Sequence, residues 1–168
     1  KNFFERFFLK PKFIQFYFVM QVLIKSALLF GAICSISSNA YSQNSDVESV
    51  KQVIVTLFDG MRAADSSIVA STFVSDAIMH SVYTNREGEV VRNVGSLEGF
   101  LTSIATPRSE ILDERIGSYN INIDGDLASV WTPYQFYVGE NFSHCGVNSF
   151  QMMRKNDEWK IIYIVDTR

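Results

Sequence analysis

Apolar residues after position 45 recur at intervals of three and four, the spacing of one face of an amphipathic helix. They are Val47, Val50, Ile54, Leu57, Phe58 and Met61. This pattern predicts a helix over residues 46–64 with one buried side. A second, short helix is expected over residues 66–73. Ser96 can cap a third helix, which ends at Pro107 because proline cannot continue a helix.

The rest of the chain alternates apolar and polar positions, which is typical of strands. Residues 77–84 and 89–92 read as a hairpin. Four further strands are expected over residues 110–123, 127–138, 142–154 and 159–167, with turns at Asp124-Gly125, Gly139-Glu140-Asn141 and Asn156-Asp157. Helices and a hairpin followed by a meander form an α+β order. The economical way to bury both is a curved antiparallel sheet wrapped around the N-terminal helix, giving an open cone.

The first 42 residues have a different character from the rest. Lys25 precedes an apolar run, and the small residues Ala40 and Ser42 stand at the −3 and −1 positions before Gln43. This pattern predicts a secretory signal peptide that is cleaved after Ser42, and therefore a periplasmic or secreted protein. Met20 is a plausible start, which would make residues 1–19 an upstream extension.

An uncleaved membrane anchor is the alternative, because residues 13–36 are long enough to span a bilayer. In either case residues 43–168 would form the single folded domain. Residues 1–42 contain five of the 15 Lys and Arg residues and one of the 18 Asp and Glu residues, so residues 43–168 carry a net charge of −7. An acidic domain without a basic cluster argues against nucleic acid as a partner.

Cysteine and histidine are scarce. Cys145 is the one cysteine after residue 42, so an intrachain disulfide within the domain is excluded. The two histidines, His80 and His144, form no metal-binding spacing with it. We therefore expect neither a metal site nor a cofactor.

Several segments resemble the nuclear transport factor 2-like superfamily, and within it the small bacterial proteins described as "putative lumazine-binding". The segments that carry the resemblance are Glu114-Arg115-Ile116, residues 123–134, residues 142–150 and Trp159-Lys160-Ile161. The resemblance covers residues 45–168 and implies a cystatin-like α+β cone with a cavity. It implies no particular reaction, because this fold supports enzymes as well as binding modules.

Such a cavity would be lined by alternate residues of the strands. The candidate ligand-binding residues are Trp131, Tyr134, His144, Asn148, Arg115, Tyr119 and His80. Their rings and polar groups suit a flat, partly polar ligand. Structural interpretations stand beside this one: the aromatic residues can fill the core, the histidines can be ordinary strand residues, and Arg115 can pair with Glu114 or Asp113. Gly146 indicates either a bulge or a close backbone approach to a ligand.

Catalysis by this chain has weaker support in the sequence. Ketosteroid isomerases of the superfamily need a carboxylate base, and the faces expected to point inward offer none; Asp59 and Asp76 are the nearest candidates. Scytalone dehydratases are the better analogue, with His80 and His144 as candidate acid and base. Cys145 follows His144 directly, so the two side chains would point to opposite faces and form no nucleophile–base pair.

Three functions therefore remain open. The first is a binding protein for a small molecule, and the second is a dehydratase- or isomerase-like enzyme that uses His80 and His144. The third is a partner-binding domain with a filled cone, in which Trp131 would be completely buried. We also expect a homodimer formed by the outer face of the sheet, with Phe136 and Val138, or Val147 and Gln151, at the contact. Membrane association is expected only if the N-terminal segment stays uncleaved.

Overall fold

The apolar stripe of the first helix forms one side of the core. The computed structural model describes residues 44–168, and this helix occupies residues 44–62. Val50, Ile54, Leu57, Phe58 and Met61 are at most 5% exposed, as the helical period predicts. They pack against sheet residues such as Phe150, whose ring meets that of Phe58 edge to face at 6.5 Å.

Two shorter helices complete the helical part. Helix α2 (Ser66–Ser71) is capped by Asp65, whose carboxylate accepts from the backbone N–H of Ser67 and Ile68. Helix α3 (Leu97–Ala105) is capped by the Ser96 hydroxyl, which accepts from the backbone N–H of Gly99 at 3.1 Å, as predicted. Among the described residues, no helix has the length and apolarity needed to cross a membrane.

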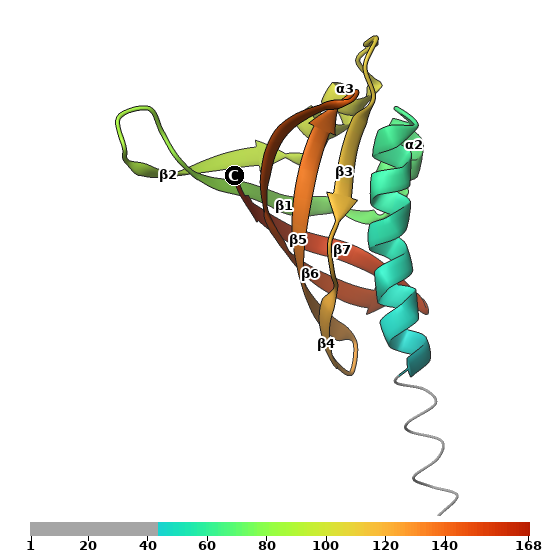
Figure 1. Ribbon diagram of the computed structural model, residues 1–168. Helices are drawn as coiled ribbons and strands as arrows, with labels where there is room; N and C mark the ends of the chain where they lie inside the picture. Colours follow the sequence, from blue (N-terminus) through green and yellow to red (C-terminus); the bar gives the residue numbers. More distant parts are fainter. Residues whose placement is uncertain (1–43) are drawn as a thin grey trace, which may run out of the picture. The chain divides into compact units, whose positions relative to one another are not determined.

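Seven strands form one curved, unclosed sheet that curls beside the first helix (Figure 1). They are β1 (Phe73–Thr84), β2 (Val90–Ser96), β3 (Leu112–Ile116), β4 (Asn120–Asp124), β5 (Leu127–Val138), β6 (Asn141–Lys155) and β7 (Glu158–Thr167). The order is β2-β1-β7-β6-β5-β3, and β4 also pairs with β5. The pairs are antiparallel except β1 with β7, which is parallel. The predicted α+β class is confirmed, with one parallel pair that the sequence did not indicate.

The predicted strand over residues 110–123 is two strands, because the ladder breaks opposite a proline. Pairing with β5 runs to Ile116 opposite Tyr134 and resumes at Asn120 opposite Trp131. Between them, the carbonyl of Pro133 accepts from the backbone N–H of Gly117 at 2.9 Å. Proline has no N–H to return, so regular antiparallel pairing cannot continue through this point.

The hairpin turns follow their residue types. Asn156 and Asp157 join β6 to β7 with positive φ at both positions, 53° and 63°, as a type I′ turn requires. The turn between β4 and β5 is formed by Gly125 and Asp126, with positive φ at Gly125. Positive φ at the first central residue alone matches a type II′ turn, whose central residues are Gly125 and Asp126 where the sequence pattern indicated Asp124 and Gly125.

Residues 1–42, with the predicted signal and its cleavage after Ser42, lie outside the described residues and stay predictions. The expected homodimer also stays a prediction, with one change to its proposed contact. Val147 and Gln151 alternate with the buried Asn148 and Phe150 and so belong to the outer face of β6. Phe136 lines a cavity on the inner side of the sheet, so it is not available to an outer-face contact.

Candidate functional site

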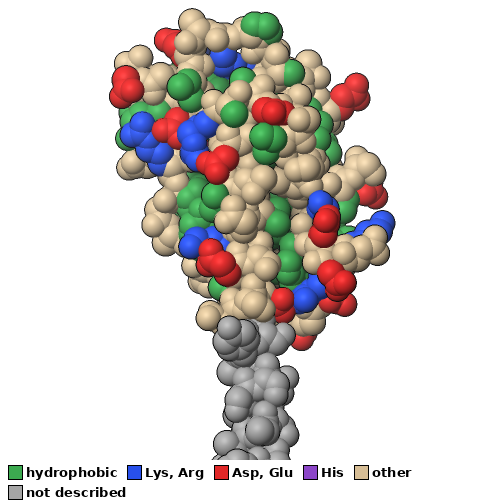
Figure 2. All heavy atoms as spheres, turned by 90° about the vertical axis from the view of Figure 1, so that its right-hand side faces the viewer, with side chains coloured by type: hydrophobic (Ala, Val, Ile, Leu, Met, Phe, Trp, Pro, Cys, Tyr) green, Lys and Arg blue, Asp and Glu red, His purple; other side chains and the backbone are tan. Residues whose placement is uncertain are grey.

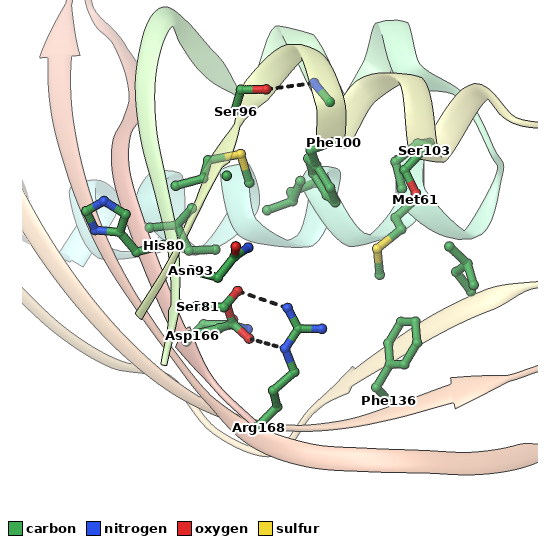
Figure 3. Close-up of a pocket in the computed structure, with 18 of the residues that line it drawn as sticks. Met61, His80, Ser81, Asn93, Ser96, Phe100, Ser103, Phe136, Asp166 and Arg168 are labelled. Carbon is green, nitrogen blue, oxygen red and sulfur yellow. Dashed lines mark hydrogen bonds and ion pairs between the residues drawn. The ribbon is translucent and has the colours of Figure 1, made fainter. Parts of the chain in front are cut away.

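A cavity of about 480 Å³ opens between the inner face of the sheet, the first helix and α3 (Figure 3). Its apolar wall comes from Phe58 and Met61 of the first helix, Phe100 of α3, and Phe73 and Phe136 of the sheet. The opposite end is polar and comes from β1, β2, β6 and β7. Both the volume and the division into an apolar wall and a polar end are typical of sites for small organic molecules.

The polar end is built by strand register. Asn148 of β6 pairs with Asp166 of β7, Asp166 pairs with Ser81 of β1, and Ser81 pairs with Asn93 of β2. Side chains at paired positions project from the same face of a sheet. The four polar side chains therefore form one row across four strands, and all four line the cavity.

Asp166 is the centre of this row. Its Oδ1 accepts a 2.5 Å hydrogen bond from the Ser81 hydroxyl. Its Oδ2 has longer contacts, 3.5 Å to the Tyr134 hydroxyl and 3.9 Å to Nε of Arg168. The Tyr134 hydroxyl has a single proton and lies closer to the Thr167 carbonyl, at 2.9 Å. Oδ2 therefore keeps acceptor capacity for another group.

Arg168 brings the positive charge of the site. Its backbone N–H donates to the Val82 carbonyl at 3.3 Å, which holds the residue against β1. Its Nη2 donates to the Ser81 hydroxyl at 3.1 Å. Figure 3 shows the guanidinium beside Ser81 and Asp166, with Phe136 on its other side. Since a guanidinium has five N–H donors, others remain for a ligand.

A close backbone crossing fixes these two residues. A Cβ built on Gly146 would lie 1.8 Å from the Thr167 carbonyl oxygen, so only glycine fits. Gly146 does mark a close backbone approach, but the approaching group is the protein's own β7 and not the expected ligand. The Thr167 hydroxyl also accepts from the backbone N–H of Val147 at 3.1 Å. The crossing thereby sets the position of Asp166 and Arg168 at either side of Thr167.

A second carboxyl lies behind the row. Asn148 donates from Nδ2 to Oε1 of Glu114 at 2.6 Å. The pKa of the Glu114 carboxyl is raised to about 7, because burial raises it more than the Asn148 hydrogen bond lowers it and the negative charge of Asp166 adds to the rise. Burial and the neighbouring charges of Asp166 and Glu114 also raise the pKa of the Tyr134 hydroxyl. Tyr134 and Glu114 therefore surround Asp166 with groups that resist ionisation.

His144 lines the cavity, as the alternation of β6 predicts. Its ring lies against Phe136, with centroids 5.0 Å apart, and meets Tyr134 edge to face at 5.8 Å. Nδ1 lies 3.0 Å from the Ser143 hydroxyl. Burial and then the charge of Arg168 lower the pKa of the imidazole, so the neutral form is favoured at neutral pH.

His80 borders the cavity, but its ring does not share a face with the polar row. Its Nδ1 lies 3.0 Å from the Tyr163 hydroxyl, and the two rings meet edge to face at 5.5 Å. Neighbouring strand residues point to opposite faces, and Ser81 is the one that meets Asp166. Figure 3 shows the His80 ring set apart from the Ser81–Asp166–Arg168 group. Ile78, two residues before His80 and on the same face of β1, is 52% exposed.

Four of the seven predicted ligand-binding residues do not line the cavity. Trp131 is 53% exposed on the outer face of β5. Arg115 is exposed, binds Asp113 at 2.6 Å and covers the Tyr137 ring. Tyr119 lies between β3 and β4 and packs against the core. Tyr134 is buried behind the polar end. The structure thus brings His144 and Asn148 together in one cavity with polar residues that the sequence did not indicate as ligand-binding. These are Ser81, Asn93, Asp166 and Arg168.

The expected lack of an inward carboxylate was wrong. Asp166 faces the cavity, and Glu114 lies directly behind it. The two carboxylates named from sequence are elsewhere: Asp59 pairs with Arg62 on the helix surface, and Asp76 is exposed. Among residues 44–168, no group of three or more His, Cys, Asp or Glu side chains is placed to hold a metal ion.

Comparison with known protein families shows which family the chain belongs to. The model of the family described as "Putative lumazine-binding" matches residues 45–165, so the chain belongs to that family. A search of curated proteins gives no significant match. The resemblance inferred from the sequence is thereby confirmed.

Solved structures confirm the fold. A nuclear transport factor 2-like protein with a cystatin-like fold from Novosphingobium aromaticivorans has a TM-score of 0.64 at 12% identity, covering 77% of this chain and 86% of that one. A protein described as a "Putative Scytalone Dehydratase" from the same organism has a TM-score of 0.59 at 11% identity, covering 76% and 86%. A protein of unknown function from Mycobacterium tuberculosis has a TM-score of 0.62 at 14% identity, covering 76% and 73%. At these identities the likeness shows the fold alone.

Proposed function

We propose that this protein binds a small, flat, partly polar molecule in the cone cavity. The observation that carries the proposal is an open cavity with an aromatic wall at one end and the Asn148–Asp166–Ser81–Asn93 row at the other. A ring system can stack on the wall while its polar edge meets the row. The family description points the same way, because a lumazine is a flat bicycle with a polar edge.

The two other functions considered have less support. An acid–base pair of His80 and His144 needs both imidazoles at one ligand atom, yet His80 contacts Tyr163 while His144 lies against Phe136. A filled cone needs a packed interior and a buried Trp131, whereas the cavity is open and Trp131 lies outside it. Binding without required turnover is the function that the geometry supports best.

Ser103→Trp is expected to abolish ligand binding. Ser103 is an exposed residue of α3 that lines the cavity, so an indole there fills the mouth without disturbing the core. The assay is thermal shift of residues 43–168 against flat heterocycles that include lumazine and a pterin. A hit at about 100 times its Kd stabilises the wild type by about 2.7 kcal/mol, a rise in Tm on the order of 10 °C. The variant should show none.

Thr102→Trp is the matched control for the Ser103→Trp substitution. Thr102 neighbours Ser103 on α3 but lines a separate groove between α2 and α3, so its indole should leave the shift intact. No hit across the library with the wild type, or a hit that Ser103→Trp leaves unchanged, would contradict binding in this cavity. If the wild type converts a hit to a product and the Asp166→Asn variant does not, the protein is an enzyme.

We also propose that residues 1–42 direct export of the domain. The supporting feature is the basic segment, apolar run and Ala40–Ser42 pair in front of Gln43. Expression of the full chain in a bacterium with N-terminal sequencing of the extracytoplasmic fraction should give a protein that begins at Gln43. Recovery of the uncleaved chain in the membrane fraction would contradict cleavage and favour an anchor.

A further inference from the structure

The charges that face the cavity balance one another. Asp166 carries the negative charge and Arg168 the positive charge, and both meet Ser81. His144 is the one histidine whose ring lies against the cavity's aromatic wall, and its lowered pKa leaves it neutral at neutral pH. An anionic ligand at Arg168 would also approach Asp166 and the buried carboxyl of Glu114. A cationic ligand at Asp166 would approach Arg168. The polar end therefore disfavours a net charge of either sign.

Donor and acceptor lie next to each other at this end. The guanidinium of Arg168 keeps N–H groups beyond those directed at Ser81 and Asp166, while Oδ2 of Asp166 has contacts of 3.5 Å and longer. Asn93 adds a side-chain amide, which has no hydrogen bond within the described residues and can serve as either partner. An uncharged group with one acceptor and one donor side by side fits such a pair.

We propose that Arg168 and Asp166 together read the C=O and N–H edge of an uncharged cyclic amide, with Arg168 donating to the carbonyl and Asp166 accepting from the N–H. This inference rests on the proposed function and names its ligand class and the two residues that select it. The aromatic wall of Phe58, Phe100 and Phe136 holds the ring that bears the amide. Asp166 then discriminates against compounds of the same shape that lack the N–H. When such a compound is bound, Oδ2 of Asp166 is covered without a close hydrogen-bond donor, which weakens binding.

Four bicyclic probes of similar shape test the inference by isothermal titration calorimetry. They are 2-quinolone, N-methyl-2-quinolone, coumarin and quinoline-2-carboxylate. The first has the C=O and N–H edge, the second and third keep the carbonyl without the N–H, and the fourth is an anion. 2-Quinolone is expected to bind the wild type at least about tenfold more tightly than the other three.

Two variants separate the roles of the residues. Asp166→Asn keeps the shape but weakens the acceptor, so the preference for 2-quinolone over coumarin should fall to about threefold or less. Arg168→Met removes the donor to the carbonyl that both share, so both should weaken while their ratio persists. Loss of folding would weaken binding of both probes and would not change the ratio of their affinities in one variant only. Circular dichroism of each variant shows whether it is folded.

Several outcomes would overturn the inference while leaving the proposed function in place. These are equal binding of coumarin and 2-quinolone, tighter binding of quinoline-2-carboxylate, or no binding of any probe when the heterocycle library gives a hit blocked by Ser103→Trp. An unchanged preference for 2-quinolone over coumarin in a folded Asp166→Asn protein would show that Asp166 does not accept from the N–H of the ligand. Failure of the four probes and of the whole library would reject the proposed function together with the inference.

Discussion

Gly146→Ala should destabilise the domain by on the order of 3 kcal/mol and abolish ligand binding at the same time. The added Cβ would lie 1.8 Å from the Thr167 carbonyl oxygen and 3.0 Å from Cε1 of Tyr134. The nearest obstacle is backbone, so β7 must move away. That movement breaks the Tyr134–Thr167 hydrogen bond and displaces Asp166 and Arg168. Urea unfolding measures the first effect, and thermal shift with a confirmed ligand measures the second.

Gly117→Ala is the matched control. Gly117 follows β3, and a Cβ there would meet the Pro133 carbonyl oxygen at 3.6 Å, an ordinary contact. We expect a change within about 0.5 kcal/mol, since alanine also restricts the unfolded chain. A Gly146→Ala protein with the stability of Gly117→Ala and full ligand binding would show that β7 does not fix the site.

Most of the fold follows from local sequence patterns. The helical stripe from Val50 to Met61, the Ser96 cap and the Asn156-Asp157 turn each depend on residues close in the chain. The parallel pairing of β1 with β7 joins segments about eighty residues apart, such as Ser81 with Asp166, and leaves no local mark. Alternation therefore predicted the strands but not which of them would meet.

The candidate site was harder to predict because strand irregularities reset the alternation. In β6 and β7, Gln151 faces Tyr163 while Met152 faces Ile161, so Ile162 is an extra residue. Counting from the buried Trp159 would place Asp166 on the outer face, yet beyond the extra residue it faces inward. A bulge of this kind has no reliable sequence signature. A carboxylate that follows the apolar run from Ile161 to Val165 was the available signal.

The aromatic residues of β5 divide between the two faces of the strand. Trp131 and Tyr134 were both proposed for the cavity, although residues three apart on a strand point to opposite faces. Tyr134 is buried and Trp131 is exposed, as that parity requires. Parity also indicated that Thr132, Tyr134 and Phe136 share one face. That face is the inner one, so Phe136 lies inside the cone and not at the expected dimer contact.

Glu114 could not be identified from sequence as a buried carboxyl, because it stands between Asp113 and Arg115 in a charged run. Its neighbours turn outward, where Asp113 binds Arg115 at 2.6 Å and also Arg62 at 3.2 Å. Glu114 turns inward to Asn148. The strand thus separates an ion pair on one face from an inward carboxyl on the other, and the pKa of the second lies near neutrality.

Glu114→Gln is expected to make the domain more stable at pH 8 and to remove a fall in stability that the wild type shows as pH rises. Burial raises the pKa of this carboxyl from 4.5 to about 7. Between those values the folded state binds the proton and the unfolded state has released it, so the free energy of unfolding falls with rising pH. The loss levels off above pH 7 at on the order of 3 kcal/mol. Glutamine keeps the oxygen that accepts from Asn148 without the charge.

Urea unfolding at pH 5 and pH 8 measures this difference, with Glu140→Gln as the control at an exposed carboxylate. The control should lose stability between the two pH values as the wild type does, while Glu114→Gln should lose about 2.5 kcal/mol less. Equal losses in the wild type and Glu114→Gln would show that Glu114 ionises as it does in water. Because Asn148 links Glu114 to the polar row, the same titration compared with and without a bound ligand would show whether the ligand changes the proton affinity of this carboxyl.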